Sequence, residues 1–315
     1  MTLQESIEKA AQCIREGKLV AFPTETVYGL GANALNPLAV AKIFELKERP
    51  TFDPLIVHIA DLNDLEKLTL NRDERVYRLA EKFWPGPLTL VLPKKDLVPD
   101  LVTSGLSSVG IRMPDNEIAL ELIRKSGCPI AAPSANKFGR ISPTTPQHVR
   151  KQLPEVDFIL EGGKTHVGIE STIITLNKKG FEILRHGIIT REEIEQVVPY
   201  YSEKAKPASL VAPGMLKSHY SPTKPFYVLS DAVLQRVDKT KAGLLSYSGN
   251  HTEGFAQVIR LTNTQDLKEY AVNLFAAMHQ LEESDVECIV AEPVPEHGIG
   301  LAIMDRLKKA AHKSR

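Results

Sequence analysis

The chain has 315 residues, and its shares of 43% hydrophobic and 25% charged residues are those of an ordinary soluble globular protein. The length favours two domains over one. Lysine plus arginine and aspartate plus glutamate each total 39, so the formal net charge is zero. This balance argues against a nucleic-acid footprint over the whole protein and leaves only a local basic patch open.

The cysteines and the N-terminus indicate the compartment. Cys13, Cys128 and Cys288 lie far apart and form neither a zinc-ligand spacing nor a disulfide framework. The chain begins MTLQESIEKA, which lacks the apolar run of a signal peptide, and no window is long and apolar enough to span a bilayer. The sequence therefore predicts a cytoplasmic protein with reduced thiols and no membrane insertion.

The first elements follow from apolar periodicity and capping residues. Residues 3–14 repeat apolar side chains at helical spacing and stop at Gly17, which predicts an amphipathic helix. A short apolar strand at 19–22 then leads into a turn rich in threonine and glycine. Asn36 and Pro37 predict the start of a second helix, with the asparagine as cap and the proline at the first helical position.

The stretch 42–58 is the centre of the interpretation, because a helix breaks there at a proline and a buried strand follows. Lys47 and Arg49 lie two residues apart at the helix end, Asp53 lies in the loop, and His58 lies in the strand. Two cations at such a turn can clamp a phosphate chain or a carboxylate. The alternatives are a cationic last turn that complements the helix dipole, and a satisfied core histidine.

The next elements alternate helices with strands. Trp84, the only tryptophan, is expected in the core rather than at a ligand. Periodicity predicts helices at 61–68, 72–84 and 115–125 and strands at 88–93 and 107–114.

Polar side chains at the ends of predicted strands are the candidate ligand groups. Thr26 follows the first strand, where α/β folds often hold their ligands, although the threonines could equally satisfy turn backbone. Arg112 lies between apolar neighbours near a strand end. A charge there is unfavourable unless it is paired, so Arg112 either holds an internal carboxylate or awaits an anionic ligand.

The same pattern recurs between residues 129 and 198. A buried strand at 129–133 runs into a loop with Ser134 and Asn136, which can bring a hydroxyl, an amide and backbone N–H groups against a nucleotide. A surface loop rich in turn-forming residues is the alternative. Ser171 stands at the entrance of the next strand, and Arg185 ends the strand after that. A helix is expected at 189–198.

The last third of the chain reads as a linker and a second domain. Residues 199–225 contain five prolines and the run APGMLKSHYSP, in which Tyr220 could reach a polar site, so this linker could act as a lid. Beyond it, strands and helices alternate as in a small doubly wound α/β domain. The predicted boundaries are 1–200 for the larger domain, 201–224 for the linker and 225–315 for the small domain.

Several familiar catalytic devices are absent from the sequence. It contains no P-loop, no dinucleotide-binding glycine motif, no H-E-x-x-H and no G-x-S-x-G elbow. The remaining cations and hydroxyls suit the binding of a polyphosphate together with a small carboxylate, with catalysis by positioning and charge stabilisation. Phosphoryl and nucleotidyl transfer require little more when Mg²⁺ neutralises the phosphates.

Six sequence blocks occur in the order expected of the YrdC-type domain: FPTETVYGLG, the Lys-x-Arg run, FWPGPLTLVL, VGIRMP, PSAN and GIESTII. With the linker and the α/β tail, nearly the whole chain resembles the long, two-domain form of the threonylcarbamoyl-AMP synthase family. The resemblance implies an α/β fold, with a twisted mixed-sheet YrdC-type domain that has a concave basic face, and a smaller Rossmann-like C-terminal domain.

The resemblance also implies a reaction and its residues. The enzyme would join L-threonine, bicarbonate or CO₂, and ATP, with Mg²⁺, into threonylcarbamoyl-AMP and pyrophosphate, for a downstream transferase that modifies tRNA. No protein metal ligands are predicted. Lys47 and Arg49 look catalytic. The ATP-side positions implied are Lys47, Arg49, Asp53, Ser108, Ser134, Asn136, Ser142, Arg185 and Tyr220. The threonine-side positions implied are Thr26, His58, Arg112, Ala132 and Ser171.

Two departures from the family pattern and two other functions stay open. Asp53 stands where the family often has asparagine, and residues 216–218 are less basic than in many relatives. The chief alternative function is binding of double-stranded RNA without catalysis, and a basic surface for it could include Lys137, Arg140, Arg150 and Lys151. Carbamoyl transfer in a maturation pathway would be expected to bring zinc-type cysteine pairs, which this sequence lacks.

Overall fold

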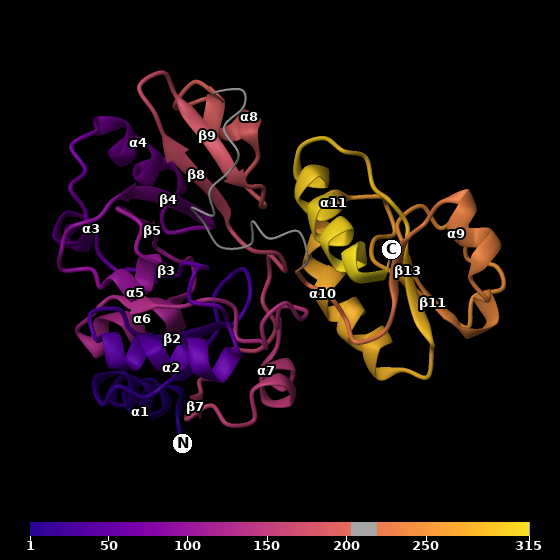
Figure 1. Ribbon diagram of the computed structural model, residues 1–315, viewed down its shortest axis with the longest axis horizontal. Helices are drawn as coiled ribbons and strands as arrows, with labels where there is room; N and C mark the ends of the chain where they lie inside the picture. Colours follow the sequence, from indigo (N-terminus) through magenta and orange to yellow (C-terminus); the bar gives the residue numbers. More distant parts are fainter. Residues whose placement is uncertain (203–218, 315) are drawn as a thin grey trace.

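Two sheets organise the molecule. The computed structural model describes residues 1–202 and 219–314 (Figure 1). Within them, a nine-stranded mixed sheet is built from the N-terminal part of the chain and a four-stranded parallel sheet from the C-terminal part. The predicted α/β class, with a mixed-sheet domain and a smaller α/β domain, is confirmed. The domain boundaries stay a prediction, since residues 203–218 lie outside the described part.

The larger sheet has the strand order β7-β1-β2-β6-β3-β5-β4-β8-β9. Its strands are β1 (Val20–Phe22), β2 (Gly29–Asn33), β3 (Ile56–His58), β4 (Leu88–Pro93), β5 (Ser108–Arg112), β6 (Ile130–Ala131), β7 (Phe158–Ile159), β8 (Thr172–Leu176) and β9 (Phe181–Arg185). The helices of this domain are α1 (Leu3–Arg15), α2 (Pro37–Lys47), α3 (Leu62–Leu68), α4 (Glu74–Phe83), α5 (Asp100–Thr103), α6 (Glu117–Ser126), α7 (Pro146–Gln152) and α8 (Arg191–Glu195).

The smaller sheet has the order β10-β13-β11-β12, and all its strand pairs are parallel. Its strands are β10 (Phe226–Val228), β11 (Ala242–Ser246), β12 (Gln257–Arg260) and β13 (Cys288–Ala291). Its helices are α9 (Asp231–Arg236), α10 (Leu267–Glu283) and α11 (Ile299–Ala310), with short 3₁₀ turns at Lys239–Lys241 and Ala311–Ser314.

Several helix ends lie where the capping residues predict them. The side chain of Asn36 accepts hydrogen bonds from two N–H groups in the first turn of α2, and Pro37 begins that helix. The buried side chains of α1 come from the predicted apolar stripe, and Gly17, just after the helix, has a positive φ of 71°. Trp84 is buried as predicted, and its indole N–H donates to the carbonyl of Leu88.

The glycine-rich segment after Thr26 was expected to be a turn, and that expectation is wrong, because residues 29–33 form strand β2. Its glycines allow close packing: a Cβ on Gly31 would lie 2.8 Å from both Phe22 and Ile130. The apolar alternation that marks most strands is therefore missing here. The short elements β7, β12, α5, α7 and α9 also lie in segments for which the sequence predicted no helix or strand.

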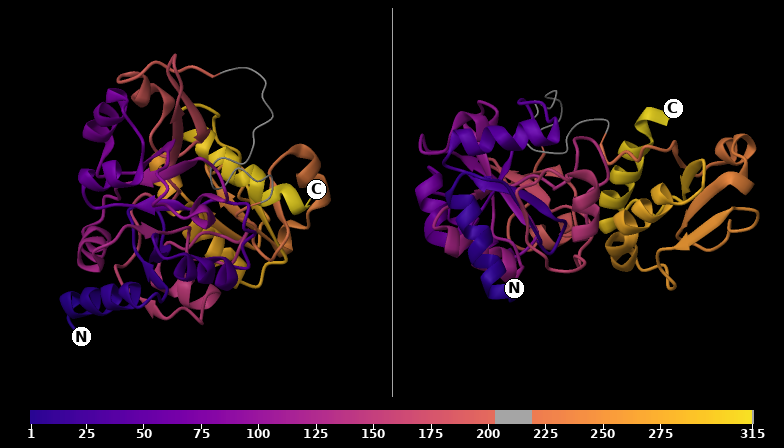
Figure 2. Two further views of the ribbon diagram at one scale, coloured as in Figure 1. Left: turned by 60° about the vertical axis from the view of Figure 1, so that its left-hand side comes forward. Right: turned by 90° about the horizontal axis from the view of Figure 1, so that it is seen from below.

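Helices α10 and α11 lie between the two sheets and face the larger domain (Figures 1 and 2). One apolar cluster crosses this boundary, since Val27 and Ile169 of the larger domain pack with Tyr220 and with residues of both helices. The rings of His148 on α7 and His279 on α10 stack with centroids 3.8 Å apart. His279 Nε2 donates to the carbonyl of Ser142. Burial lowers the pKa of both histidines.

These two histidines should make stability depend on pH. Below pH 6.5 the two histidines stay neutral in the folded protein but bind protons in the unfolded chain. The free energy of unfolding should therefore fall as the pH is lowered, and for His279 this fall should extend from pH 6.5 to about 4. His279→Phe keeps a stacking ring and removes one such proton, so the slope of unfolding free energy against pH should decrease by about 1.4 kcal/mol per unit. Urea unfolding between pH 4.5 and 6.5 measures it. His297→Phe, at an exposed position, is the matched control, and an unchanged slope in His279→Phe would refute the prediction.

Candidate active site

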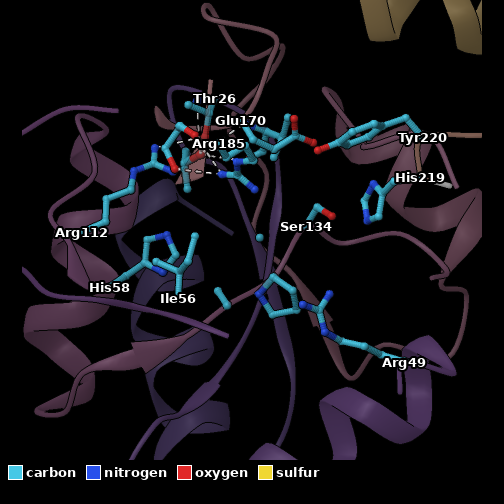
Figure 3. A pocket seen from close by; sticks show the side chains of 16 residues that line it. Thr26, Arg49, Ile56, His58, Arg112, Ser134, Glu170, Arg185, His219 and Tyr220 are labelled. Carbon is cyan, nitrogen blue, oxygen red and sulfur yellow. Dashed lines mark hydrogen bonds between the residues drawn. The ribbon is translucent and has the colours of Figure 1, made fainter. Parts of the chain in front are cut away.

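The main candidate site is a cavity in the larger domain, at the ends of several strands (Figure 3). His58 ends β3, Arg112 ends β5 and Arg185 ends β9, so the central sheet brings these side chains to one place. The threonine-side residues predicted from the sequence all line it, namely Thr26, His58, Arg112, Ala132 and Ser171. Four of the ATP-side residues also line it, namely Arg49, Ser134, Arg185 and Tyr220.

Arg112 is the cation on one side of the cavity. Its side chain is buried, with its Nη2 atom 2.6 Å from Glu25 Oε1, and the same nitrogen donates to Thr26 Oγ1 at 3.0 Å. Its Nε atom has no hydrogen-bond partner among the described residues. Both sequence interpretations therefore hold in part, because Arg112 pairs with an internal carboxylate and also lines the cavity with an unused donor. Glu25 stands directly before Thr26 at the same predicted strand end, but the sequence does not predict that it pairs with Arg112.

His58 lies beside Arg112. Burial and the charge of Arg112 lower the pKa of His58 to about 3, so the imidazole is neutral at physiological pH. Its ring meets that of Phe22 edge-on, and among residues 1–202 and 219–314 its Nδ1 atom has no hydrogen-bond partner. In a satisfied core histidine both ring nitrogens would have hydrogen-bond partners. His58 instead offers the cavity an unused polar atom.

Arg49 is the cation on the opposite side of the cavity (Figure 3). Helix α2 ends at Lys47, and the next residue, Glu48, has a left-handed φ of 55° that turns the chain out of the helix. Arg49 Nε and Nη2 donate to the carbonyls of Asp53 and Pro54, and Nη2 lies 2.9 Å from Asp53 Oδ2. Asp53 thus pairs with Arg49 and orients its guanidinium.

Lys47 does not line the cavity. Its Nζ atom is buried and donates to the carbonyls of Ser134 and Asn136 at 2.7 and 2.5 Å. Burial and the nearby Arg49 lower the pKa of Lys47 well below its ordinary value. Asn136 is also turned away, since its amide donates to the carbonyls of Lys137 and Arg140. In this structure the two side chains hold the loop that presents Ser134 to the cavity.

Glu170 and Arg185 each hold a predicted serine at the cavity wall. Glu170 lines the cavity and accepts a hydrogen bond from the hydroxyl of Ser142 at 2.5 Å, which places Ser142 just behind the wall. Arg185 Nε and Nη2 donate to the carbonyl of Ser171, and Nη2 also donates to its hydroxyl. The block GIESTII, which contains Glu170, is one of the six sequence blocks of the family, but no local feature of the sequence predicts the role of this carboxylate.

The residues directly after the undescribed segment close another side of the cavity. His219 and Tyr220 both line it, and within the part of the chain that the structure describes the Tyr220 hydroxyl and His219 Nδ1 have no hydrogen-bond partner. Burial raises the pKa of Tyr220, so its hydroxyl stays protonated. The rest of the predicted lid, residues 211–218, lies outside the described residues.

Ser108 is the predicted ATP-side residue farthest along the sheet. It begins β5, the strand that Arg112 ends, and it lines a neighbouring hollow rather than the main cavity. Ile56 lines both spaces, so the hollow at Ser108 adjoins the cavity.

Three of the four cations considered for an RNA surface are paired with carboxylates. Lys137 pairs with Glu48, Lys151 with Glu283, and Arg150 with Glu161. Within residues 1–202 and 219–314, no cluster of three or more His, Cys, Asp or Glu side chains could hold a metal ion. The described helices include none that is long and apolar enough to cross a membrane.

Comparison with known proteins identifies the family. The Sua5–YciO–YrdC family model, described as telomere recombination, matches residues 12–187, and the model of the threonylcarbamoyl-AMP synthase C-terminal domain matches residues 189–312. The threonylcarbamoyl-AMP synthase of Pyrococcus abyssi is 44% identical, over 99% of this chain and 97% of the relative. That of Bacillus subtilis is 43% identical, over 98% of this chain and 94% of the relative.

A solved structure gives the same result in three dimensions. The crystal structure of P. abyssi Sua5 complexed with L-threonine superposes with a TM-score of 0.87 at 43% identity, and the match covers 100% of this chain and 96% of that one. Both domains and the order of the sequence blocks are thus accounted for by one family. The chain belongs to the threonylcarbamoyl-AMP synthase family, in its long two-domain form.

Proposed function

We propose that this protein is an L-threonylcarbamoyladenylate synthase, which makes threonylcarbamoyl-AMP and pyrophosphate from L-threonine, bicarbonate or CO₂, and ATP. The observation that carries the proposal is the placement of Arg112 and Arg49 on opposite sides of one cavity (Figure 3). Separate cations suit a pair of substrates with two separate anionic groups, an amino-acid carboxylate and a triphosphate.

Threonine would occupy the side of the cavity that Arg112 lines. The unused Nε donor of Arg112 suits a carboxylate, and the neutral imidazole of His58 offers an unused nitrogen to a polar group of the amino acid. Thr26 and Ser171 bring hydroxyl groups, and Ala132 adds only a methyl group to the wall. These residues would place the threonine amine toward the middle of the cavity.

ATP would occupy the side lined by Arg49, Ser134 and Tyr220, with Arg185 between the two substrates and Ser108 farther along the sheet. Lys47 and Asn136 would act by holding the Ser134 loop. Mg²⁺ would enter with the triphosphate, whose oxygens supply most ligands in such sites, because the described residues hold no metal cluster of their own. The ion would neutralise part of the phosphate charge.

The reaction would proceed in two bond-forming steps. The threonine nitrogen attacks the carbon of CO₂ and loses a proton, which gives a carbamate. A carbamate oxygen then attacks the α-phosphorus of ATP in line, and the bond to the bridging oxygen breaks, so that pyrophosphate leaves with the electron pair. Arg49 would stabilise charge on the pyrophosphate. A wall closed by His219 and Tyr220 would exclude water from the labile acyl adenylate.

The product is an activated acyl group, so a threonylcarbamoyl transferase acting on tRNA would have to consume it. We propose a cytoplasmic location, where ATP and tRNA are available and where Cys13, Cys128 and Cys288, which form no disulfide in the structure, would stay reduced.

Pyrophosphate release from ATP, measured with each of the twenty amino acids with and without bicarbonate, tests this function. We expect release that requires both L-threonine and bicarbonate. No release with any amino acid, in folded protein, would refute the proposal. A salt titration of tRNA binding would then examine the RNA-binding alternative, whose signature is a steep loss of affinity with salt.

A further inference from the structure

We infer that Arg306, on helix α11 of the C-terminal domain, is a positioning residue of the active site, which acts by neutralising Glu170 in the cavity wall. The inference rests on the proposed function, since it assigns Arg306 an effect on ATP binding. It also gives the C-terminal domain a task in catalysis.

The side chain of Arg306 crosses from one domain to the other. It is fully buried, and its Nε atom donates to Glu170 Oε2 at 3.2 Å. Its Nη1 atom donates to the carbonyl of His186 at 2.6 Å, directly after strand β9. Two groups that belong to the larger domain are therefore held by one guanidinium from the smaller domain.

Glu170 connects Arg306 to the cavity wall. Its Oε2 atom meets Arg306, while its Oε1 atom accepts the hydrogen bond of Ser142, so both oxygens are engaged. The guanidinium carbon of Arg306 also lies 5.5 Å from the ring centroid of Tyr220. Glu170 and Tyr220 both line the cavity, so the position of Arg306 determines two parts of its wall.

The charges indicate what the pair does. Burial alone would raise the pKa of Glu170. The charges of Arg306 and Arg185 outweigh burial and lower the pKa below its ordinary value, so the carboxylate is ionised. With Arg306 present, the buried pair is neutral, so Glu170 adds no net negative charge to the wall that an anion approaches. Without Arg306, Glu170 would lose the cation that it contacts and keep only the influence of Arg185, so the wall of a site proposed to bind a triphosphate would be more negative by one charge.

A structural role alone would have a different signature. If Arg306 only joined the two domains, its loss would destabilise the protein and affect both substrates alike. If it neutralises Glu170, its loss should affect the polyanionic substrate most, and removal of the Glu170 charge should reverse that effect. A double-mutant cycle separates the two roles.

The experiment compares full-length Arg306→Gln, Glu170→Gln and the double variant by pyrophosphate release. Lys308→Gln is the matched control, because Lys308 is an exposed cation on the same helix. We expect Arg306→Gln to raise KM for ATP at least about tenfold, with a smaller change in KM for threonine. We expect the double variant to return KM for ATP to within about threefold of the wild type.

A double variant no better than Arg306→Gln, or an equal rise in both KM values, would overturn the inference. Should Arg306→Gln not fold, Arg306→Lys replaces it because lysine keeps the charge. A KM for ATP within about threefold of the wild type then supports charge neutralisation, and a rise of about tenfold or more in folded protein refutes it. Absence of wild-type turnover would refute the proposed function instead, so the two failures are distinguishable.

Discussion

Arg49→Ala is expected to lower kcat/KM for ATP at least about a thousandfold. Arg49 lines the cavity with its guanidinium held by two backbone carbonyls and by Asp53, so its position is fixed before substrate arrives. An arginine preorganised in this way can stabilise charge on the leaving pyrophosphate without reorganisation. Steady-state pyrophosphate release measures the loss, and circular dichroism establishes that the variant is folded.

Two variants serve as controls for Arg49. Arg49→Lys keeps the charge but loses the planar fork, so its activity should fall between those of the wild type and Arg49→Ala. Lys42→Ala removes an exposed cation from the same helix and should leave kcat/KM nearly unchanged. Turnover near the wild-type rate in folded Arg49→Ala would remove this residue from the proposed mechanism.

Much of the fold follows from local sequence signals. Asn36 and Pro37 start α2 because one side chain caps the first turn and the other needs no N–H partner, and both effects act within a few residues. Strand β2 was not predicted because glycines, which allow close contact with Phe22 and Ile130, stand where a strand pattern would show apolar side chains. This close packing depends on residues of neighbouring strands, so the local sequence pattern does not indicate it.

In the candidate site, too, residues with a local sequence signal could be predicted, and residues defined by contacts distant in the sequence could not. Residues at strand ends, such as Arg112 and Arg185, could be predicted because a cation beside apolar neighbours needs a partner. Glu170 could not, since its partner Arg306 lies 136 residues away in the other domain. For Lys47, the helix end was predictable, but only the fold brings the carbonyls of the Ser134 loop to its Nζ atom.

Arg112→Gln should raise KM for threonine at least about a hundredfold, because the amino-acid carboxylate would lose its cation. KM for ATP should change far less, since Arg49 on the opposite side of the cavity is untouched. The same substitution leaves Glu25 buried without its partner, so the free energy of unfolding should fall by about 3 kcal/mol. Pyrophosphate release with varied threonine and urea unfolding measure the two effects.

The double variant Arg112→Gln/Glu25→Gln separates stability from substrate binding. Two amides of similar shape replace a buried ion pair, so the free energy of unfolding should recover most of its loss. KM for threonine should stay high, because neither amide supplies a positive charge to the substrate carboxylate. If threonine binding recovered together with stability, Arg112 would serve only to hold Glu25, and the carboxylate of threonine would need a different partner in the cavity.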